Sequence, residues 1–329
     1  MIRFLFSFLI VLVSISKEAY GQQEALSGMY SPVFTPFNTS SGEIDLSVIP
    51  EYAQFLKDGG TDGVSVATLT GEGLSLSVDE KKKLYEAWVN AARPLGLKII
   101  VQVGGIPVPD IIELTHYAVN ISVDGIQLLP PPYYIITNSD EFVALLEIVA
   151  ENAGDLPIYY DDFYEYTLEE EDDFSLQSYF DSASRRVAQF KGMVGTFRVA
   201  VYASLENDPR SDQTIFIYNQ PNVEAAAFMD CNSFMLPAMN IFPSLFKQIV
   251  DLSSNGTRSE EALAIQDRLN DIVYEILDKG DDVATLKAAA ELVSGIKLGG
   301  VRPPMRALSR TTYMEIKDIL EDNDVETHD

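Results

Sequence analysis

Three groups of residues in this sequence could carry chemistry. Asp161 and Asp162 are adjacent carboxylates, a residue type that acts as acid or base in hydrolysis. Adjacent side chains of an extended chain point to opposite sides, so we do not expect these two to act as a pair. Lys191 carries an amine that becomes a nucleophile when neutral. The segment Thr70–Gly73 combines a hydroxyl, a carboxylate and two glycines.

Patterns for metals and cofactors are sparse. The segment Thr70–Gly73 lacks the lysine of a phosphate-binding loop. His116, His328 and Cys231 are far apart in the sequence, which argues against a zinc site, and we expect no cofactor. The acidic run 161–173 is typical of a solvated loop or a helix start. Weak calcium binding is the alternative, because carboxylate oxygens bind that hard cation, although the spacing is not that of an EF-hand.

The first 21 residues have the pattern of a secretory signal peptide. Arg3 precedes an apolar run from Phe4 to Ile15, and a small-x-small sequence ends at Gly21. The apolar run is too short to cross a bilayer comfortably. We expect residues 1–21 to be cleaved and the mature chain to be extracellular. An uncleaved signal anchor or a buried N-terminal helix is the alternative.

The charge and the glycosylation motifs fit an exported protein. The formal net charge is −27, and such a surface repels nucleic acid and anionic membranes, so neither is expected as a partner. The same charge opposes an anionic substrate unless the site itself is basic. Three Asn-x-Ser/Thr sequons begin at Asn38, Asn120 and Asn255, and we expect them to be glycosylated.

Short apolar runs alternate with amphipathic helical segments along most of the chain. Before the helix 79–92, Ser77 is an N-cap and Glu80 follows three residues later, which is the pattern of a capping box. Eight strand–helix units predict a closed (β/α)8 barrel, with a doubly wound sheet as the alternative that periodicity leaves open. The predicted strands are Tyr30–Thr35, Gly63–Thr68, Lys98–Val103, Gly125–Leu129, Pro157–Tyr160, Gly192–Thr196, Thr214–Tyr218 and Ser233–Ala238.

The barrel is expected to span residues 22–255. A C-terminal extension of three helices is expected over 256–322, packed on the outside of the barrel, and a disordered acidic tail over 323–329. The three predicted helices are Ser259–Asp278, Asp282–Val293 and Ser309–Glu321.

Several segments together resemble the family of N-acetylneuraminate lyase and dihydrodipicolinate synthase. Residues 70–77 read Thr-Gly-Glu-Gly-Leu-Ser-Leu-Ser, Ser31–Phe37 is similar to the family's first strand, and Arg302–Pro304 is similar to its C-terminal region. The resemblance runs from about residue 28 to 310. It implies a (β/α)8 barrel with a helical C-terminal extension, usually tetrameric, so we expect a homo-oligomer, either a tetramer or a dimer.

The resemblance also implies where catalytic groups should lie. In the family a lysine on strand six forms a Schiff base with the substrate ketone, and a tyrosine at the end of strand five moves protons. The matching positions here are Val194 and Asp161. Lys191 lies three residues before Val194, so on a regular strand it faces the opposite side and lies nearer the N-terminal end. A register error or a bulge is the alternative that would let Lys191 serve. We expect no catalytic residue of the family type.

Other family positions keep only parts of a substrate site. Leu69 replaces one of two carboxylate-binding hydroxyls, and Leu236 and Tyr218 add bulk where the family has glycine. The positions that remain from the substrate site are Thr70, Gly71, Glu72, Tyr134 and Asn240.

The signal peptide and these substitutions together predict a secreted barrel that has lost aldolase activity and has a binding or structural role outside the cell. The alternative is an active N-acetylneuraminate lyase with relocated groups, using Lys191 or another lysine. A barrel enzyme with new acid chemistry around Asp161 is a third hypothesis.

Overall fold

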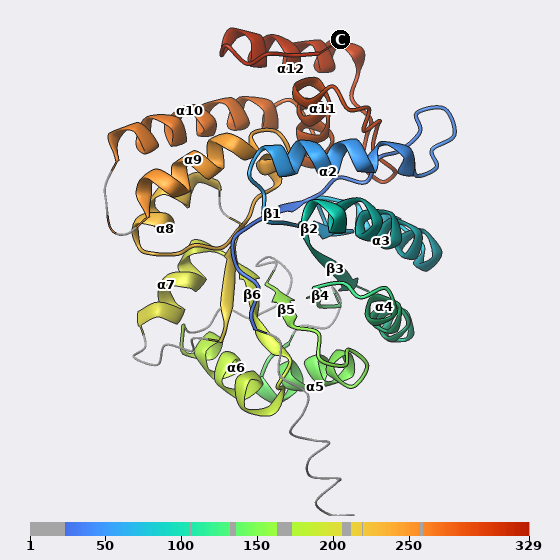
Figure 1. Cartoon of the computed structure of the whole chain (residues 1–329), viewed down its shortest axis with the longest axis vertical. Coiled ribbons are helices and arrows are strands. Elements are labelled where there is room, and N and C mark those ends of the chain that lie inside the picture. Colours follow the sequence, from blue (N-terminus) through green and yellow to red (C-terminus); the bar gives the residue numbers. More distant parts are fainter. Residues whose placement is uncertain are drawn as a thin grey trace, which may run out of the picture.

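Eight parallel strands close into a barrel in the computed structural model, with helices around it (Figure 1). Each strand pairs with the next, and β1 pairs with β8. The predicted (β/α)8 barrel is therefore confirmed. The structure describes residues 24–105, 107–131, 136–162, 173–205, 212–218, 220–254, 256 and 259–328. The strands are β1 Met29–Pro32, β2 Gly63–Val66, β3 Lys98–Gly104, β4 Gly125–Leu129, β5 Ile158–Asp161, β6 Phe190–Gly195, β7 Thr214–Ile217 and β8 Phe234–Met235.

Helices cover the outside of the barrel because each has one apolar face. In α3 the buried side chains include Leu84, Trp88 and Val89, which recur at helical spacing. The predicted capping box of Ser77 and Glu80 is present at its N-terminus. The barrel helices are α2 Ile49–Asp58, α3 Val78–Ala92, α4 Val108–Asn120, α5 Ser139–Ala150, α6 Asp173–Arg186, α7 Phe197–Leu205, α8 Val223–Phe228 and α9 Pro243–Ser253.

Two parts of the barrel differ from the sequence prediction. Strand β8 ends at Met235, and a 3-10 helix follows over Pro237–Asn240, because proline has no N–H to donate to a sheet. Short helices α7 and α8 were not predicted; α8 has only six residues, too few for a periodic pattern to stand out.

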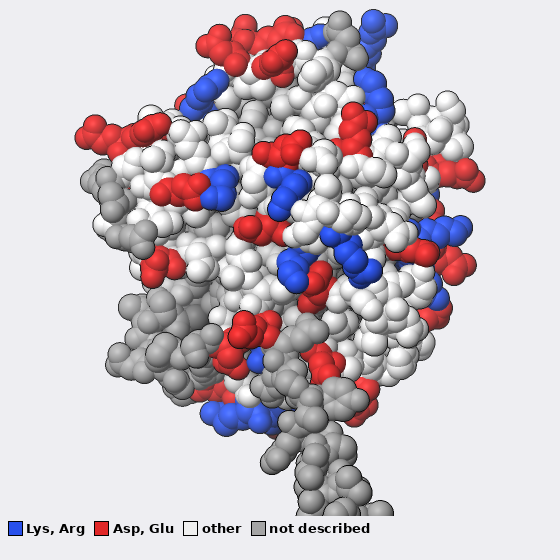
Figure 2. All heavy atoms as spheres, viewed as in Figure 1, with Lys and Arg blue, Asp and Glu red and all other residues white. Residues whose placement is uncertain are grey.

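The C-terminal extension consists of α10 Glu260–Leu277, α11 Asp282–Ser294 and α12 Arg310–Asp322 (Figure 1). The tail was expected to be disordered, but residues 323–328 lie against the extension: Val325 packs on the core, and the His328 N–H donates to the Leu292 carbonyl at 2.7 Å. Within the described ranges, no helix is long and apolar enough to cross a membrane. Acidic side chains are spread over the face shown in Figure 2, with basic ones among them.

Candidate functional site

A cavity of about 120 Å³ lies at the carboxyl ends of the barrel strands. Active sites of (β/α)8 barrels gather at this end, because the βα loops bring side chains from several strands together there. Three positions singled out in the sequence, Val194, Asp161 and Thr70, line this one cavity. Its lining residues are Pro32, Thr68, Leu69, Thr70, Gln127, Asp161, Val194, Tyr218, Met235 and Pro237.

Val194 projects into the barrel interior. It is 4% exposed and packs in an apolar layer with Tyr159, Phe216 and Met235. The Tyr159 and Phe216 rings meet edge to face at 5.3 Å between centroids. The Cα atoms of Val194 and Asp161 are register partners on β6 and β5. A hydrocarbon therefore occupies the inward position on the sixth strand, next to a carboxylate on the fifth.

Asp161 is held by two glutamine side chains from neighbouring strands. Its Oδ2 accepts hydrogen bonds from Gln102 Nε2 at 2.6 Å and from Gln127 Nε2 at 2.7 Å. Gln127 Oε1 in turn accepts from the Ser65 hydroxyl at 2.6 Å. This chain of buried polar groups crosses β2 to β5 and fixes the orientation of the carboxyl.

Burial raises the pKa of Asp161 to about 7, against an ordinary value of 3.8. The two glutamine amides lower this pKa because they stabilise the charged form, and the neighbouring carboxylate of Asp162 raises it. Asp162 does not line the cavity, in agreement with the expectation that these adjacent side chains diverge. Among the described lining residues, none is basic, so no cation offsets the charge of Asp161.

Lys191 lies at an irregularity of the barrel that the sequence does not reveal. The β5–β6 register shifts so that Phe190 pairs with Ile158 but Gly192 pairs with Tyr159, which leaves Lys191 as the extra residue of a bulge. The regular strand expected here is wrong, and the bulge that was left open as the alternative is present. The Lys191 ammonium lies 3.2 Å from Asp212 Oδ2, just before β7, and Lys191 does not line the cavity.

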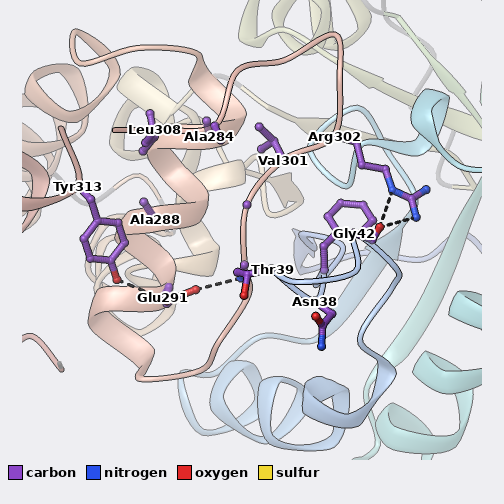
Figure 3. A pocket seen from close by; sticks show the side chains of 14 residues that line it. Asn38, Thr39, Gly42, Ala284, Ala288, Glu291, Val301, Arg302, Leu308 and Tyr313 are labelled. Carbon is purple, nitrogen blue, oxygen red and sulfur yellow. Dashed lines mark hydrogen bonds between the residues drawn. The ribbon is translucent and has the colours of Figure 1, made fainter. Parts of the chain in front are cut away.

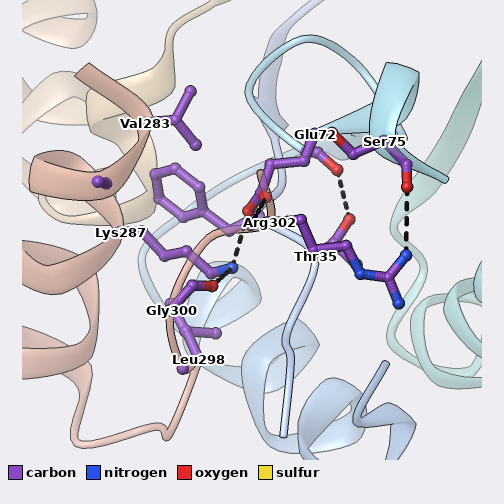
Figure 4. Close-up of polar contacts among 12 residues, drawn as sticks. Thr35, Glu72, Ser75, Val283, Lys287, Leu298, Gly300 and Arg302 are labelled. Atoms are coloured by element: carbon purple, nitrogen blue, oxygen red, sulfur yellow. Dashed lines mark hydrogen bonds and ion pairs between the residues drawn. The ribbon is translucent and has the colours of Figure 1, made fainter. Parts of the chain in front are cut away.

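Glu72 connects the loop after β2 to the C-terminal extension (Figure 4). Its Oε1 accepts from the Lys287 ammonium at 2.9 Å, and its Oε2 accepts from the Arg302 N–H at 2.8 Å. Both side chains of the Glu72–Lys287 pair are almost fully buried. The carboxylate of Glu72, a residue expected among the positions that remain from the substrate site, therefore joins two parts of the fold.

Gly71 and Asn240 also have structural roles. A Cβ on Gly71 would lie 2.7 Å from the Val33 carbonyl oxygen, so the chain passes too closely for a side chain. The Asn240 amide donates to the Pro32 carbonyl at 2.8 Å and accepts from the Tyr52 hydroxyl at 2.6 Å. Neither lines the cavity, and their assignment to the substrate site stays a prediction.

Of the replaced family positions Leu69, Tyr218 and Leu236, two line the cavity. Leu69 and Tyr218 are lining residues. Leu236 is fully buried but belongs to the core between barrel and helices, so its bulk does not fill the site. Met235 and Pro237, on either side of Leu236, line the cavity. Tyr134 lies outside the described residues.

A second cavity, of about 430 Å³, lies between α11, α12 and the loop after β1 (Figure 3). Phe37, Ala288 and Leu308 supply much of its apolar wall. Glu291 also lines it, and its Oε2 accepts from the N–H groups of Leu298 and Gly299 at 2.9 and 3.0 Å. This carboxylate holds the extension in place, and the cavity lies outside the barrel interior.

Two sequon asparagines, Asn38 and Asn120, are exposed, and Asn255 lies outside the described residues. Most of the acidic run 161–173, for which weak calcium binding was the alternative, also lies outside them. In the part of the chain that the structure describes, no cluster of His, Cys, Asp or Glu could hold a metal ion.

Gln102 and Gln127 are site residues that sequence analysis missed. Each is the only polar residue in the middle of a buried strand, in Val101-Gln102-Val103 and Ile126-Gln127-Leu128. Buried polar side chains need hydrogen-bond partners. A lone amide in an apolar strand was therefore the available signal for an inward-facing polar network.

The closed barrel with a lined cavity at the carboxyl ends of its strands belongs to the (β/α)8-barrel class that places active sites at that end. The model of the Dihydrodipicolinate synthetase family matches residues 25–323, and the chain belongs to that family.

Several similar proteins are N-acetylneuraminate lyases. The mouse N-acetylneuraminate lyase is 26% identical over 287 residues, which cover 86% of this chain and 88% of the relative. The human enzyme is 27% identical over 291 residues, covering 88% and 89%. The solved structure of Proteus mirabilis N-acetylneuraminate lyase superposes with a TM-score of 0.82 at 21% identity, covering 92% of this chain and 99% of that one. This structural similarity supports the fold.

Proposed function

We propose that this protein is a secreted member of the family that has lost Schiff-base aldolase chemistry and acts as a binding or structural protein outside the cell. The observation that carries the proposal is Val194, whose isopropyl group occupies the inward position on β6 beside Asp161. A Schiff base needs a neutral amine in contact with the substrate ketone. No lysine is among the described residues that line the cavity.

Lys191 does not replace the missing amine in this proposal. Its ammonium lies 3.2 Å from Asp212 Oδ2, and Lys191 is not among the described residues that line the cavity. The substitution of Asp161 at the family's tyrosine position adds negative charge where a keto acid carboxylate would have to bind.

Borohydride trapping tests this proposal directly. The protein is incubated with pyruvate or N-acetylneuraminate, reduced with borohydride, and analysed by intact mass and peptide mapping. We expect no adduct, whereas a stable adduct on any lysine contradicts the proposal. Secretion is tested separately by expressing the full chain in a eukaryotic cell and sequencing the N-terminus of protein from the medium, with cleavage expected after Gly21.

Similarity to the lyases favours a second candidate, an active N-acetylneuraminate lyase with relocated groups, because the mouse enzyme matches 86% of the chain. Release of pyruvate from N-acetylneuraminate, abolished in Lys191→Ala, would establish it. The homo-oligomer stays a prediction, checked by light scattering of the purified chain.

A further inference from the structure

We propose that the cavity at the barrel mouth binds a small primary amine in its ammonium form, through Asp161 and the hydroxyls of Thr68 and Thr70. This inference rests on the proposed function. It adds the class of ligand that the cavity at the barrel mouth would bind. All three residues line the same cavity. An ammonium group has three N–H donors, and the lining residues include one carboxylate, two threonine hydroxyls and the phenol of Tyr218 as acceptors.

The charge of the cavity decides between ligand classes. Asp161 is the one carboxylate among the described lining residues, and none of them is basic. An anion would enter without a counter-charge, at a site in which burial strengthens repulsion. A cation gains a charge-assisted hydrogen bond, which is about twice as strong as a neutral one.

The geometry of Asp161 suits this role. Both glutamine amides bind Oδ2, so Oδ1 is the oxygen that can bind a ligand in the cavity. Among the described residues, Asp162, the next on the chain, acts on the pKa of Asp161, and Tyr218 is the other titratable residue that lines the cavity. Neither carries a positive charge, so neither neutralises Asp161.

The size and walls of the cavity limit the ligand. A volume of about 120 Å³ is equivalent to roughly four water molecules. Leu69, Val194 and Met235 supply hydrocarbon surface that suits a short alkyl chain. Ethylammonium has one nitrogen and two carbons, and the best small ligands gain a limited free energy per atom, so we expect a Kd in the millimolar range at best, about 1 mM.

Ligand-observed NMR of the full chain with ethylammonium chloride tests the proposal at pH 8.5. The cation control is sodium chloride at equal ionic strength, the neutral control is acetamide and the anion control is pyruvate. We expect saturation transfer to ethylammonium alone. Asp161→Asn should weaken binding about tenfold or more, as for a lost hydrogen bond to a charged group. Asp155→Asn removes the same charge at an exposed site and should leave binding unchanged.

Two further measurements keep the proposal falsifiable if Asp161→Asn does not fold. Val194→Lys places an ammonium beside Asp161 from within the chain and should abolish ethylammonium binding. Lowering the pH to 5.5 protonates the carboxyl and should weaken binding more than tenfold, given a pKa of about 7. Binding that is as strong in Asp161→Asn or Val194→Lys as in wild type, or that is no stronger at pH 8.5 than at 5.5, overturns the inference, as does preferred binding of pyruvate. A lysine adduct after borohydride reduction overturns the proposed function instead.

Discussion

Asp161→Asn should change how the stability of this protein depends on pH. Burial raises the pKa of Asp161 from 3.8 to about 7 in the folded protein. Between these values the folded chain keeps a proton that the unfolded chain releases, so the free energy of unfolding falls as the pH rises through this window. Above pH 7 both states are ionised at this position, and its contribution no longer changes.

The magnitude follows from the size of the shift. One pKa unit corresponds to about 1.4 kcal/mol, so a shift of roughly three units corresponds to about 4 kcal/mol. Asparagine does not titrate, and its carbonyl oxygen can still accept from Gln102 and Gln127. The difference in unfolding free energy between Asp161→Asn and wild type should therefore shift in favour of the variant by up to about 4 kcal/mol from pH 4 to pH 8.

Urea denaturation followed by circular dichroism at several pH values between 4 and 8 measures this difference. All other carboxylates titrate in both proteins, so their contribution cancels in the comparison. For Asp155→Asn, at an exposed position, the unfolding free energy should change with pH as it does in wild type. If the unfolding free energy of Asp161→Asn also changes with pH as that of wild type does, the two glutamine amides have a larger effect on the pKa of Asp161 than burial has. Asp161 is then ionised throughout this range.

Three other variants test separate parts of the structure. Lys287→Met leaves the carboxylate of Glu72 buried without its cation and should lower the unfolding free energy by about 3–5 kcal/mol in urea denaturation. Gly192→Ala should lower it by more than about 1 kcal/mol in the same assay, because φ is +132° and a Cβ would lie 1.8 Å from the Thr214 carbonyl oxygen. Val194→Lys should give no pyruvate adduct with borohydride, because an ion pair with Asp161 keeps the new amine protonated.

The sequence predicted the barrel well because local patterns determine it. Each buried strand is a short apolar run, and the capping box at Ser77 marks a helix start without any tertiary information. The direction in which the Leu236 side chain points was harder to predict, because a one-residue shift in register moves a side chain to the other face of the sheet. The inward facing of Val194 and Asp161 followed from the resemblance, which fixed the register at those two strands.

The bulge at Lys191 and the partners of Glu72 could not be predicted from local patterns. The bulge depends on a glycine with positive φ that packs against β7, and a glycine in a strand is compatible with several causes. Glu72 and Lys287 are 215 residues apart in sequence, so only the folded chain brings them together.

The segments that most resemble the family are those that hold the fold together. Glu72, in the Thr-Gly-Glu-Gly segment, binds the backbone of Arg302, which begins the Arg-Pro-Pro segment. The guanidinium of Arg302 donates to the Ser75 carbonyl at 3.2 Å and to Glu80 at 2.6 Å. Replacing any of these groups leaves a buried or half-buried partner without its hydrogen bonds. Val194 and Tyr218 line a cavity, where a change of side chain leaves the backbone hydrogen bonds of the barrel intact. The same scaffold can therefore persist while its chemistry is lost, and resemblance in these motifs is evidence for the fold and not for the reaction.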